Sequence, residues 1–151
     1  MPIERNQLSK LIVLSDYQRG FIEGMLDGEG CICLSKPKRK SSYLVLHPEI
    51  KITNTNYDIL NKISKMIDNR CSIHKRKQMK KKWKPCYLLR IHSDAATEIL
   101  SQMKLTIKEK KRKIVLKVFE ILRKRQHGFG RWNLNYKNKQ IIRYYKEFYN
   151  D

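Results

Sequence analysis

The sequence predicts an α+β domain in which helices cover one face of a four-stranded, largely antiparallel sheet. A glycine-striped amphipathic helical pattern is followed by a switch from the helical period of 3.6 to the strand period of 2. Two hairpin patterns then alternate with helical patterns, in the order helix, hairpin, helix, hairpin, helices. At 151 residues the chain is expected to form one domain with a real core.

The first helix is expected to begin after Ser15, with Gln18 as its capping-box partner. One broad apolar arc is formed by Tyr17, Phe21, Ile22, Met25 and Leu26. Gly20, Gly24 and Gly28 recur at every fourth position and form a bare stripe beside this arc. Gly30 is expected to end the helix with a positive φ. The stripe is free to pack on a second helix, so Gly20, Gly24 and Asp27 are predicted at a dimer interface.

Glu29 lies at the C-terminal end of this helix, where the helix dipole disfavours a carboxylate. A divalent cation would reverse that penalty, and Mg²⁺ prefers carboxylate oxygens. The alternative is that Glu29 is a solvated carboxylate in a turn.

The first hairpin is predicted from strands at 31–37 and 43–53, joined by a basic turn. Pro48 is expected to mark an edge or a bulge in the second strand. Thr55 with Asp58 then predicts a helix start, and helical spacing continues to residue 67 with Asn69 as the stop.

The second hairpin has a basic tip at 80–84 and a return strand at 86–92. Ser93 is expected to cap a helix that runs to Met103, and Thr106 with Glu109 is expected to form the capping box of a longer helix. The segment 127–130 breaks that helix, and residues 138–149 again show helical spacing.

Charge points to a polyanionic partner, because 34 lysines and arginines against 14 aspartates and glutamates give a net charge of +20. Anionic lipid and ribosomal-type RNA are the alternatives. No apolar run is long enough to span a membrane and no secretory signal is recognised, so an intracellular protein is expected, in the cytoplasm, nucleoid or an organelle.

The cysteines are expected to be reduced thiols, because no pair has zinc-site spacing. Cys31 and Cys33 share a strand face but are expected to be out of each other's reach. A Cys71–Cys86 disulfide across the second hairpin is the alternative.

The outward face of the sheet and the hairpin tips are the predicted DNA reader, since their side chains can bond to base edges or phosphates. An ordinary solvated sheet face is the alternative. The predicted contacts are Ser35, Lys38, Arg39, Lys40, Glu49, Lys51, Thr53, His74, Arg76, Gln78, Lys80, Lys82, Arg90 and His92.

Residues 22–30, Ile-Glu-Gly-Met-Leu-Asp-Gly-Glu-Gly, resemble the signature of the LAGLIDADG homing endonucleases, and the element order is similar over roughly residues 10–125. The resemblance implies an αββαββα fold over residues 1–130, with residues 131–151 as a helical tail docked on the domain or on a partner subunit. It also implies a magnesium-dependent nuclease, in which manganese can substitute. A single motif implies a homodimer that makes a staggered cut with 3′ overhangs in a long, near-palindromic double-stranded DNA site.

The resemblance also assigns roles to individual residues. Glu29 corresponds to the acidic metal ligand, although most members carry Asp there, and the Gly28 carbonyl is an implied additional ligand. Asn54 corresponds to a polar position around the attacking water, and either Lys104 or Lys108 corresponds to a catalytic lysine. The alternatives within this fold are an RNA-splicing maturase and a nucleic-acid-binding protein that does not cleave.

Overall fold

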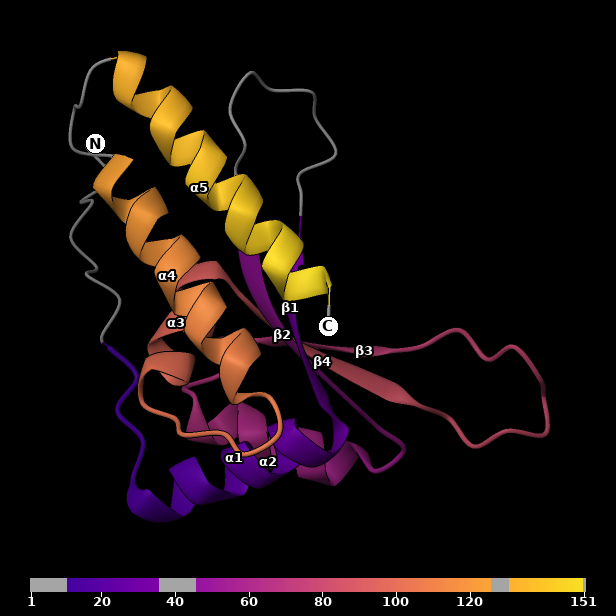
Figure 1. The fold of residues 1–151 in the computed structure, drawn as a ribbon. Helices are drawn as coiled ribbons and strands as arrows, with labels where there is room; N and C mark the ends of the chain where they lie inside the picture. The colour runs from indigo at the N-terminus through magenta and orange to yellow at the C-terminus, as the bar shows by residue number, and fades with distance from the viewer. Residues whose placement is uncertain (1–10, 36–45, 126–130, 151) are drawn as a thin grey trace, which may run out of the picture.

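The computed structural model describes the backbone of residues 11–35, 46–125 and 131–150, and their side chains except at 123–125 and 131–138. The elements are α1 (Asp16–Glu29), β1 (Gly30–Ser35), β2 (His47–Asn54), α2 (Tyr57–Met66), β3 (Ser72–Lys75), β4 (Tyr87–His92), α3 (Ser93–Ser101), α4 (Glu109–Arg125) and α5 (Arg131–Tyr149). The predicted fold class is confirmed, and Figure 1 shows α4 and α5 lying side by side.

The four strands form one antiparallel sheet in the order β1-β2-β4-β3. The prediction that Pro48 marks an edge or a bulge is wrong, because β2 lies inside the sheet and its register with β1 continues through Pro48 with no extra residue. Pro48 pairs with Leu34 of β1, while pairing with β4 begins one residue later, at Glu49. A proline is tolerated there because it stands outside the ladder that joins β2 to β4.

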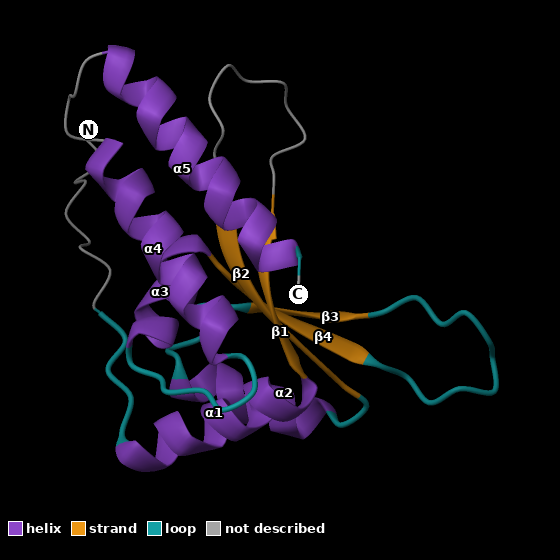
Figure 2. Ribbon diagram, viewed as in Figure 1, coloured by secondary structure: helices purple, strands orange, loops and turns teal. Residues whose placement is uncertain are grey.

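One face of the sheet is buried against the helices and supplies the centre of the core. Its apolar side chains are almost fully buried, namely Ile32, Leu34, Ile50, Ile52, Leu89 and Ile91. In Figure 2 the helices lie to the left of and below the strands, while the loop between β3 and β4 extends to the right, away from them. The other, open face of the sheet is less buried, because Lys51, Thr53 and Arg90 are half-buried and His92 is exposed, although Glu49 on this face is buried.

Both ends of α1 follow the sequence prediction, with Gly30 as the C-cap, but the predicted backbone angle at Gly30 does not. Ser15 and Gln18 form the predicted capping box. The prediction of a positive φ at Gly30 is wrong, because its φ is −89° and its ψ is 169°. Glycine is required for space instead. A Cβ at Gly30 would lie 2.8 Å from the Leu26 Cα and 2.9 Å from the Leu26 carbonyl oxygen.

Gly30→Ala is therefore expected to lower the free energy of unfolding by about 1–3 kcal/mol, because the backbone of Leu26 has to shift. Urea denaturation measures this loss. Ser35→Ala, at the other end of the same strand, is the control and should cost less than about 1 kcal/mol. Equal stability of the Gly30 variant and the wild type would show that the corner accepts a side chain.

The predicted starts of α2 and α3 are wrong. The α2 N-cap is Asn56 rather than Thr55, since the Asn56 side chain accepts from the backbone N–H groups of Asp58 and Ile59. Ser93 does not cap α3 but is its first residue, with a φ of 47°, and the N-cap is His92. The predicted stop of α2 fits better, because Asp68 and Asn69 both have positive φ.

The helix α5 joins the core through its C-terminal half. Ile141 and Phe148 are buried, and the Tyr149 hydroxyl donates to the Leu34 carbonyl of the edge strand β1 at 2.9 Å. No helix among the described residues is long and apolar enough to cross a membrane.

All four cysteines are free. The expectation that Cys31 and Cys33 lie out of reach of each other is wrong, because their sulfur atoms are 3.4 Å apart. Burial, followed by the neighbouring Cys31 thiol, raises the pKa of Cys33 to about 11, which keeps it a thiol.

Candidate functional site

The C-terminal end of α1 carries an exposed carboxylate that faces an amide. Gly30, directly after Glu29, pairs with Ile52 of β2, and this pairing brings the end of β2 to the end of α1. The Asn54 amide nitrogen donates to Glu29 Oε2 at 2.5 Å. The Asn54 side-chain oxygen accepts from the Asn56 backbone N–H at 2.8 Å, which fixes the amide in this orientation.

A second pair of contacts joins the end of α1 to the start of α4. The Asp27 carboxylate accepts three backbone N–H groups, from Thr106 at 2.7 Å, Lys108 at 3.1 Å and Ile107 at 3.2 Å. In return, the Lys108 ammonium donates to the carbonyl oxygens of Leu26 at 2.8 Å and Asp27 at 2.5 Å. The negative charge of Asp27 thus lies at the N-terminal end of α4, and the positive charge of Lys108 lies at the C-terminal end of α1. Each charge is of the sign that the helix dipole favours at that end.

This reciprocal tie corrects one prediction and bears on another. The Asp27 carboxylate is turned toward its own chain, and the place of Asp27 at a dimer interface stays a prediction. Thr106 was expected to cap α4 with Glu109, but Asp27 caps that loop and Glu109 accepts from Leu105. Burial alone would raise the pKa of Asp27, but the backbone N–H groups of Thr106, Lys108 and Ile107 lower it below its ordinary value.

The two candidate lysines lie at different places. The Lys104 backbone N–H donates to Glu23, almost two turns of α1 before Glu29, while Lys108 contacts the last turn of α1. Lys108 is therefore the lysine that the fold holds beside the acidic end of the helix.

The oxygen donors at the end of α1 suit a hard divalent cation. They are the exposed Glu29 carboxylate and the carbonyl groups of the last helical turn, and Mg²⁺ accepts one or two carboxylates while keeping several waters. No group of three or more His, Cys, Asp or Glu side chains that could hold a metal occurs among the described residues. A cation here would thus need further ligands from water, a second chain or a phosphate.

The glycine stripe of α1 faces away from the core. Gly20, Gly24 and Gly28 are exposed, and a Cβ built at any of them would meet nothing within 4 Å. Tyr17 lies on the same side of the helix, one turn earlier, and is 63% exposed. Glycines with this much free space are not required by the packing of the single chain.

On the open face of the sheet, Glu49 is buried beneath three basic side chains. Glu49 is only 5% exposed, and its carboxylate lies 2.9 Å from Arg90 Nη2, 3.0 Å from His92 Nδ1 and 3.1 Å from Lys51 Nζ. We call these four residues the Glu49 cluster. Burial alone would raise the pKa of Glu49, but Lys51 and Arg90 hold it below its ordinary value. Glu49 is therefore not freely presented on this face, and its predicted contact with DNA stays a prediction.

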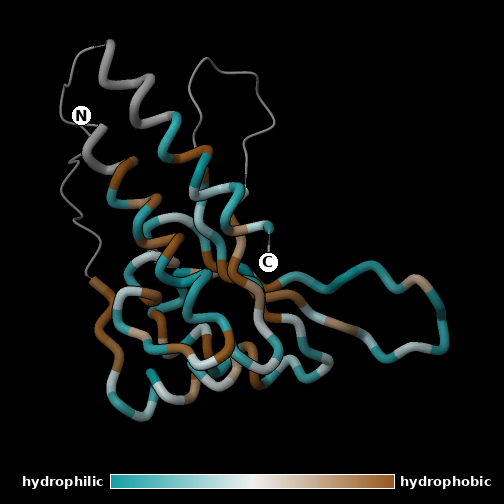
Figure 3. Tube along the Cα trace, in the orientation of Figure 1, coloured by the Kyte–Doolittle hydropathy of each residue, from teal (hydrophilic) through white to brown (hydrophobic). Residues whose placement is uncertain are grey.

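The loop between β3 and β4 is exposed and mostly hydrophilic (Figure 3). His74, Arg76 and Lys82 are exposed as predicted. Gln78 holds the loop by donating to the Trp83 carbonyl at 2.8 Å, and Lys80 lies over the Trp83 ring at 5.4 Å. Ser35 donates to the His47 carbonyl at 3.2 Å, and Thr53 is half-buried. Lys38, Arg39 and Lys40 lie outside the described residues.

A charged pair tightens the start of α4 close to Lys108. Arg112 donates to both oxygens of Glu109, at 2.7 and 2.8 Å, and to the Leu100 carbonyl at 2.9 Å. These bonds from Arg112 lower the pKa of Glu109 to about 2. Because the folded pKa lies below the unfolded value, this pair stabilises the fold above about pH 4.5 and loses its effect as the pH falls toward about 2.

Arg112→Ala is expected to lower the free energy of unfolding by about 1–3 kcal/mol at neutral pH. The difference from the wild type should shrink as the pH falls through this window, because protonated Glu109 no longer needs the pair. Urea denaturation across the pH range checks this, with the exposed Lys117→Ala on the same helix as control. A difference that stays constant with pH would contradict the assignment.

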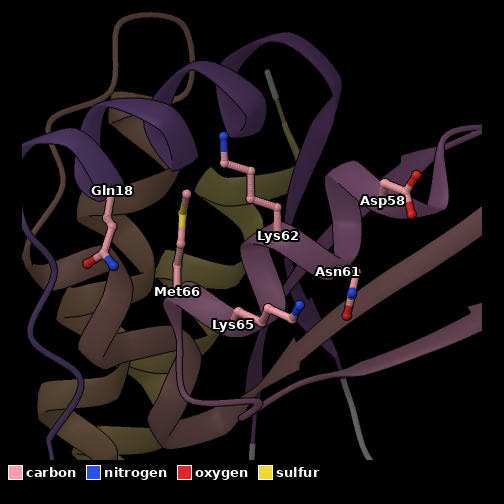
Figure 4. A pocket seen from close by; sticks show the side chains of 6 residues that line it. All are labelled: Gln18, Asp58, Asn61, Lys62, Lys65 and Met66. Carbon is pink, nitrogen blue, oxygen red and sulfur yellow. The ribbon is translucent and has the colours of Figure 1, made fainter.

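A hollow between α1 and α2 lies at the opposite end of α1 from Glu29 (Figure 4). It is lined by Gln18, Asp58, Asn61, Lys62, Lys65 and Met66. The Lys62 ammonium is 2.9 Å from the Tyr17 hydroxyl and lies over the Phe21 ring. These contacts join α2 to the exposed side of α1, and the hollow takes no part in the Glu29 site.

Residues 16–104 match the family model described as LAGLIDADG-like domain. This match spans more than half of the chain and includes α1, the whole sheet and α3. No curated protein matches the chain.

Solved structures share the fold at low sequence identity. The archaeal intron-encoded homing endonuclease I-Vdi141I, complexed with DNA, has a TM-score of 0.67 and 16% identity over 88% of this chain and 82% of its own. The homing endonuclease I-TnaI has a TM-score of 0.65 and 17% identity over 87% of both chains. I-SmaMI, bound to an uncleaved DNA target in the presence of calcium ions, has a TM-score of 0.64 and 17% identity over 86% of this chain and 44% of its own.

Proposed function

The chain belongs to the LAGLIDADG family, and from that membership we propose that it is a site-specific DNA endonuclease that acts as a homodimer and requires a divalent metal ion, Mg²⁺ or Mn²⁺. The observation that carries this proposal is the exposed Glu29 carboxylate at the end of the glycine-striped helix. Asn54 donates to this carboxylate, and the Lys108 ammonium is bound to the last turn of the same helix. The homing endonuclease structures that share the fold support a DNA substrate.

The residues of this chain divide the work of phosphodiester hydrolysis. Glu29, with the Gly28 carbonyl, would hold the metal ion, which activates water and stabilises the leaving oxyanion when bound. Asn54 fixes the Glu29 carboxylate and is placed to orient water. Lys108 brings a positive charge to the scissile phosphate, and it is preferred to Lys104 because its ammonium already contacts the last turn of α1.

A second copy of the chain would complete the site. One chain supplies a single Glu29, and the exposed glycine stripe allows another α1 to approach closely, which would bring two carboxylates to one axis. The relative lengths of the similar proteins support this reading. The chain covers 87% of I-TnaI but 44% of I-SmaMI, which has room for two such units. A dimer of this kind would cut a near-palindromic site in both strands and leave 3′ overhangs.

The open sheet face and the β3–β4 loop are the proposed DNA interface. Lys51, Arg90 and His92 line the face, and Arg76 with the lysines at 80–84 extends it along the loop. We further propose that residues 1–130 form the nuclease domain and that residues 131–151 dock on it, which the burial of Ile141 and Phe148 supports. An intracellular location follows from the proposed substrate.

Arg76→Ala is expected to cost about 1–3 kcal/mol of binding at one base position if Arg76 reads a base edge. The expected measurement is the affinity for a panel of single-base variants of the target. A uniform loss across all sequences would instead identify Arg76 as a phosphate contact. Lys82→Ala, in the same loop, is the comparison for phosphate contacts.

The experiment that tests the function is cleavage of a library of random duplexes by the purified chain with Mg²⁺, followed by sequencing of the cut ends. We expect one family of related sites, cut in both strands, and no cutting when EDTA is present. Binding to structured RNA without cleavage of any duplex would favour the maturase alternative, and binding to DNA without cleavage would favour a non-cleaving DNA-binding protein.

A further inference from the structure

The Glu49 cluster brings two cations face to face across the open side of the sheet. Lys51 of β2 is the direct cross-strand partner of Arg90 of β4, and Glu49 is the direct partner of His92. Side chains at directly opposite positions have Cβ atoms about 4.5–5.5 Å apart, and like charges there are destabilising. The pairing of Lys51 with Arg90 is therefore unfavourable unless an anion lies between them.

Glu49 supplies that anion. Glu49 Oε1 pairs with Arg90 Nη2 and His92 Nδ1, and Glu49 Oε2 lies beside Lys51 Nζ. A single buried carboxylate thus restrains three basic side chains. Arg90 Nε is buried and has no hydrogen-bond partner among the described residues, so the arrangement does not satisfy Arg90 fully. The unpaired donor is therefore a buried Nε beneath the face where DNA is proposed to bind, and Glu49 holds Arg90 through Nη2 alone.

We propose that Glu49 is a specificity-determining positioning residue, which fixes Lys51, Arg90 and His92 for base recognition while reducing their attraction for phosphates of any sequence. The proposal rests on the proposed DNA endonuclease function. Two physical effects support it. Restrained side chains lose less conformational entropy when they bind a base. A neutralising carboxylate reduces the number of counterions that the cluster releases from non-specific DNA.

Glu49→Gln is the central test, because it keeps the size of the side chain and removes its charge. Binding is measured at several salt concentrations to two probes, a pool of random-sequence duplexes and the duplex that the wild-type chain selects from that pool. For the random pool we expect higher affinity, with a slope of log K against log salt that is steeper by about 0.9. The ratio of selected to random affinity should fall by about tenfold or more.

The sites that Glu49→Gln selects from the pool provide a readout that a purely structural role would not change. Relaxed base preference should appear at the same positions as in Lys51→Ala or Arg90→Ala, with the other positions unchanged. Glu49→Asp keeps the charge but is one methylene shorter, so it should restore the salt slope while base preference stays relaxed at those positions. Glu147→Gln, which removes an exposed carboxylate on α5, is the matched control.

An equal loss of affinity for both probes with an unchanged salt slope would overturn the proposal. If thermal unfolding shows that Glu49→Gln does not fold, the selection by Glu49→Asp decides, and an unrelaxed preference would also overturn it. A wild-type chain that selects no duplex would overturn the proposed function and this inference with it. A wild-type chain that selects and cuts a duplex, with Glu49→Gln indistinguishable from it, would overturn the role of Glu49 alone.

Discussion

Glu29→Gln is expected to abolish DNA cleavage while leaving DNA binding nearly unchanged. The amide keeps the size of the side chain but removes the charge that would hold the metal ion. The loss should exceed the about 10–100-fold that follows removal of a group that only hydrogen-bonds to a metal ligand. Asn54→Ala should show that smaller loss, because Asn54 contacts Glu29 rather than replacing it as a ligand.

Cleavage of the selected duplex with Mg²⁺, measured together with its affinity in calcium, separates chemistry from binding. Glu147→Gln controls for the removal of one negative charge from this basic chain. Retained cleavage by Glu29→Gln would show that another group holds the metal. If Glu29→Gln instead lowers the affinity for the duplex but cleaves the duplex that it does bind at the wild-type rate, Glu29 would be a DNA contact.

Gly24→Leu is expected to convert the protein from a dimer to a monomer and to remove double-strand cleavage. The structure gives this prediction a clean test, because a Cβ at Gly24 meets nothing within 4 Å in the single chain. The variant should therefore fold, and leucine should gain up to about 1 kcal/mol in helix propensity. Any loss of activity would come from the face that the leucine blocks.

Sedimentation velocity over a range of protein concentrations measures the association, and circular dichroism verifies the fold. Ser101→Leu introduces the same side chain at an exposed position of α3 and should remain dimeric. A Gly24→Leu protein that sediments like the wild-type dimer would contradict the role assigned to the glycine stripe. A wild-type monomer that cuts both strands would contradict it more directly.

The element order and the family were predictable because their signals are local. Hydrophobic periodicity runs through long segments of the chain, and nine consecutive residues, 22–30, carry the family signature. The capping box at Ser15 is equally local, since both of its partners lie within one turn. These predictions are confirmed by the structure and by the family match.

The errors share a physical cause, which is that tertiary contacts override local patterns. Thr106 with Glu109 reads as a capping box, but Asp27, 79 residues away from Thr106, takes the N–H groups of that loop. Alternation in β2 places Glu49 on the outer face correctly but cannot show that Lys51, Arg90 and His92 cover it. The sequence did carry one signal for this cluster. Glu49 is the one acidic residue at the outward positions of β2 and β4, which also hold Lys51, Arg90 and His92.

The reciprocal tie between Asp27 and Lys108 has a practical consequence for work with shortened versions of the protein. The family match ends at residue 104, yet the loop that Asp27 holds and the ammonium that reaches the end of α1 both lie beyond it. A truncation at that boundary would retain the signature and the entire sheet. It would leave the carbonyl oxygens of Leu26 and Asp27 without the Lys108 ammonium, and the Asp27 carboxylate without its three backbone N–H donors. Protein engineers who recombine halves of such nucleases should place their junctions after α4, not at the limit of recognisable similarity.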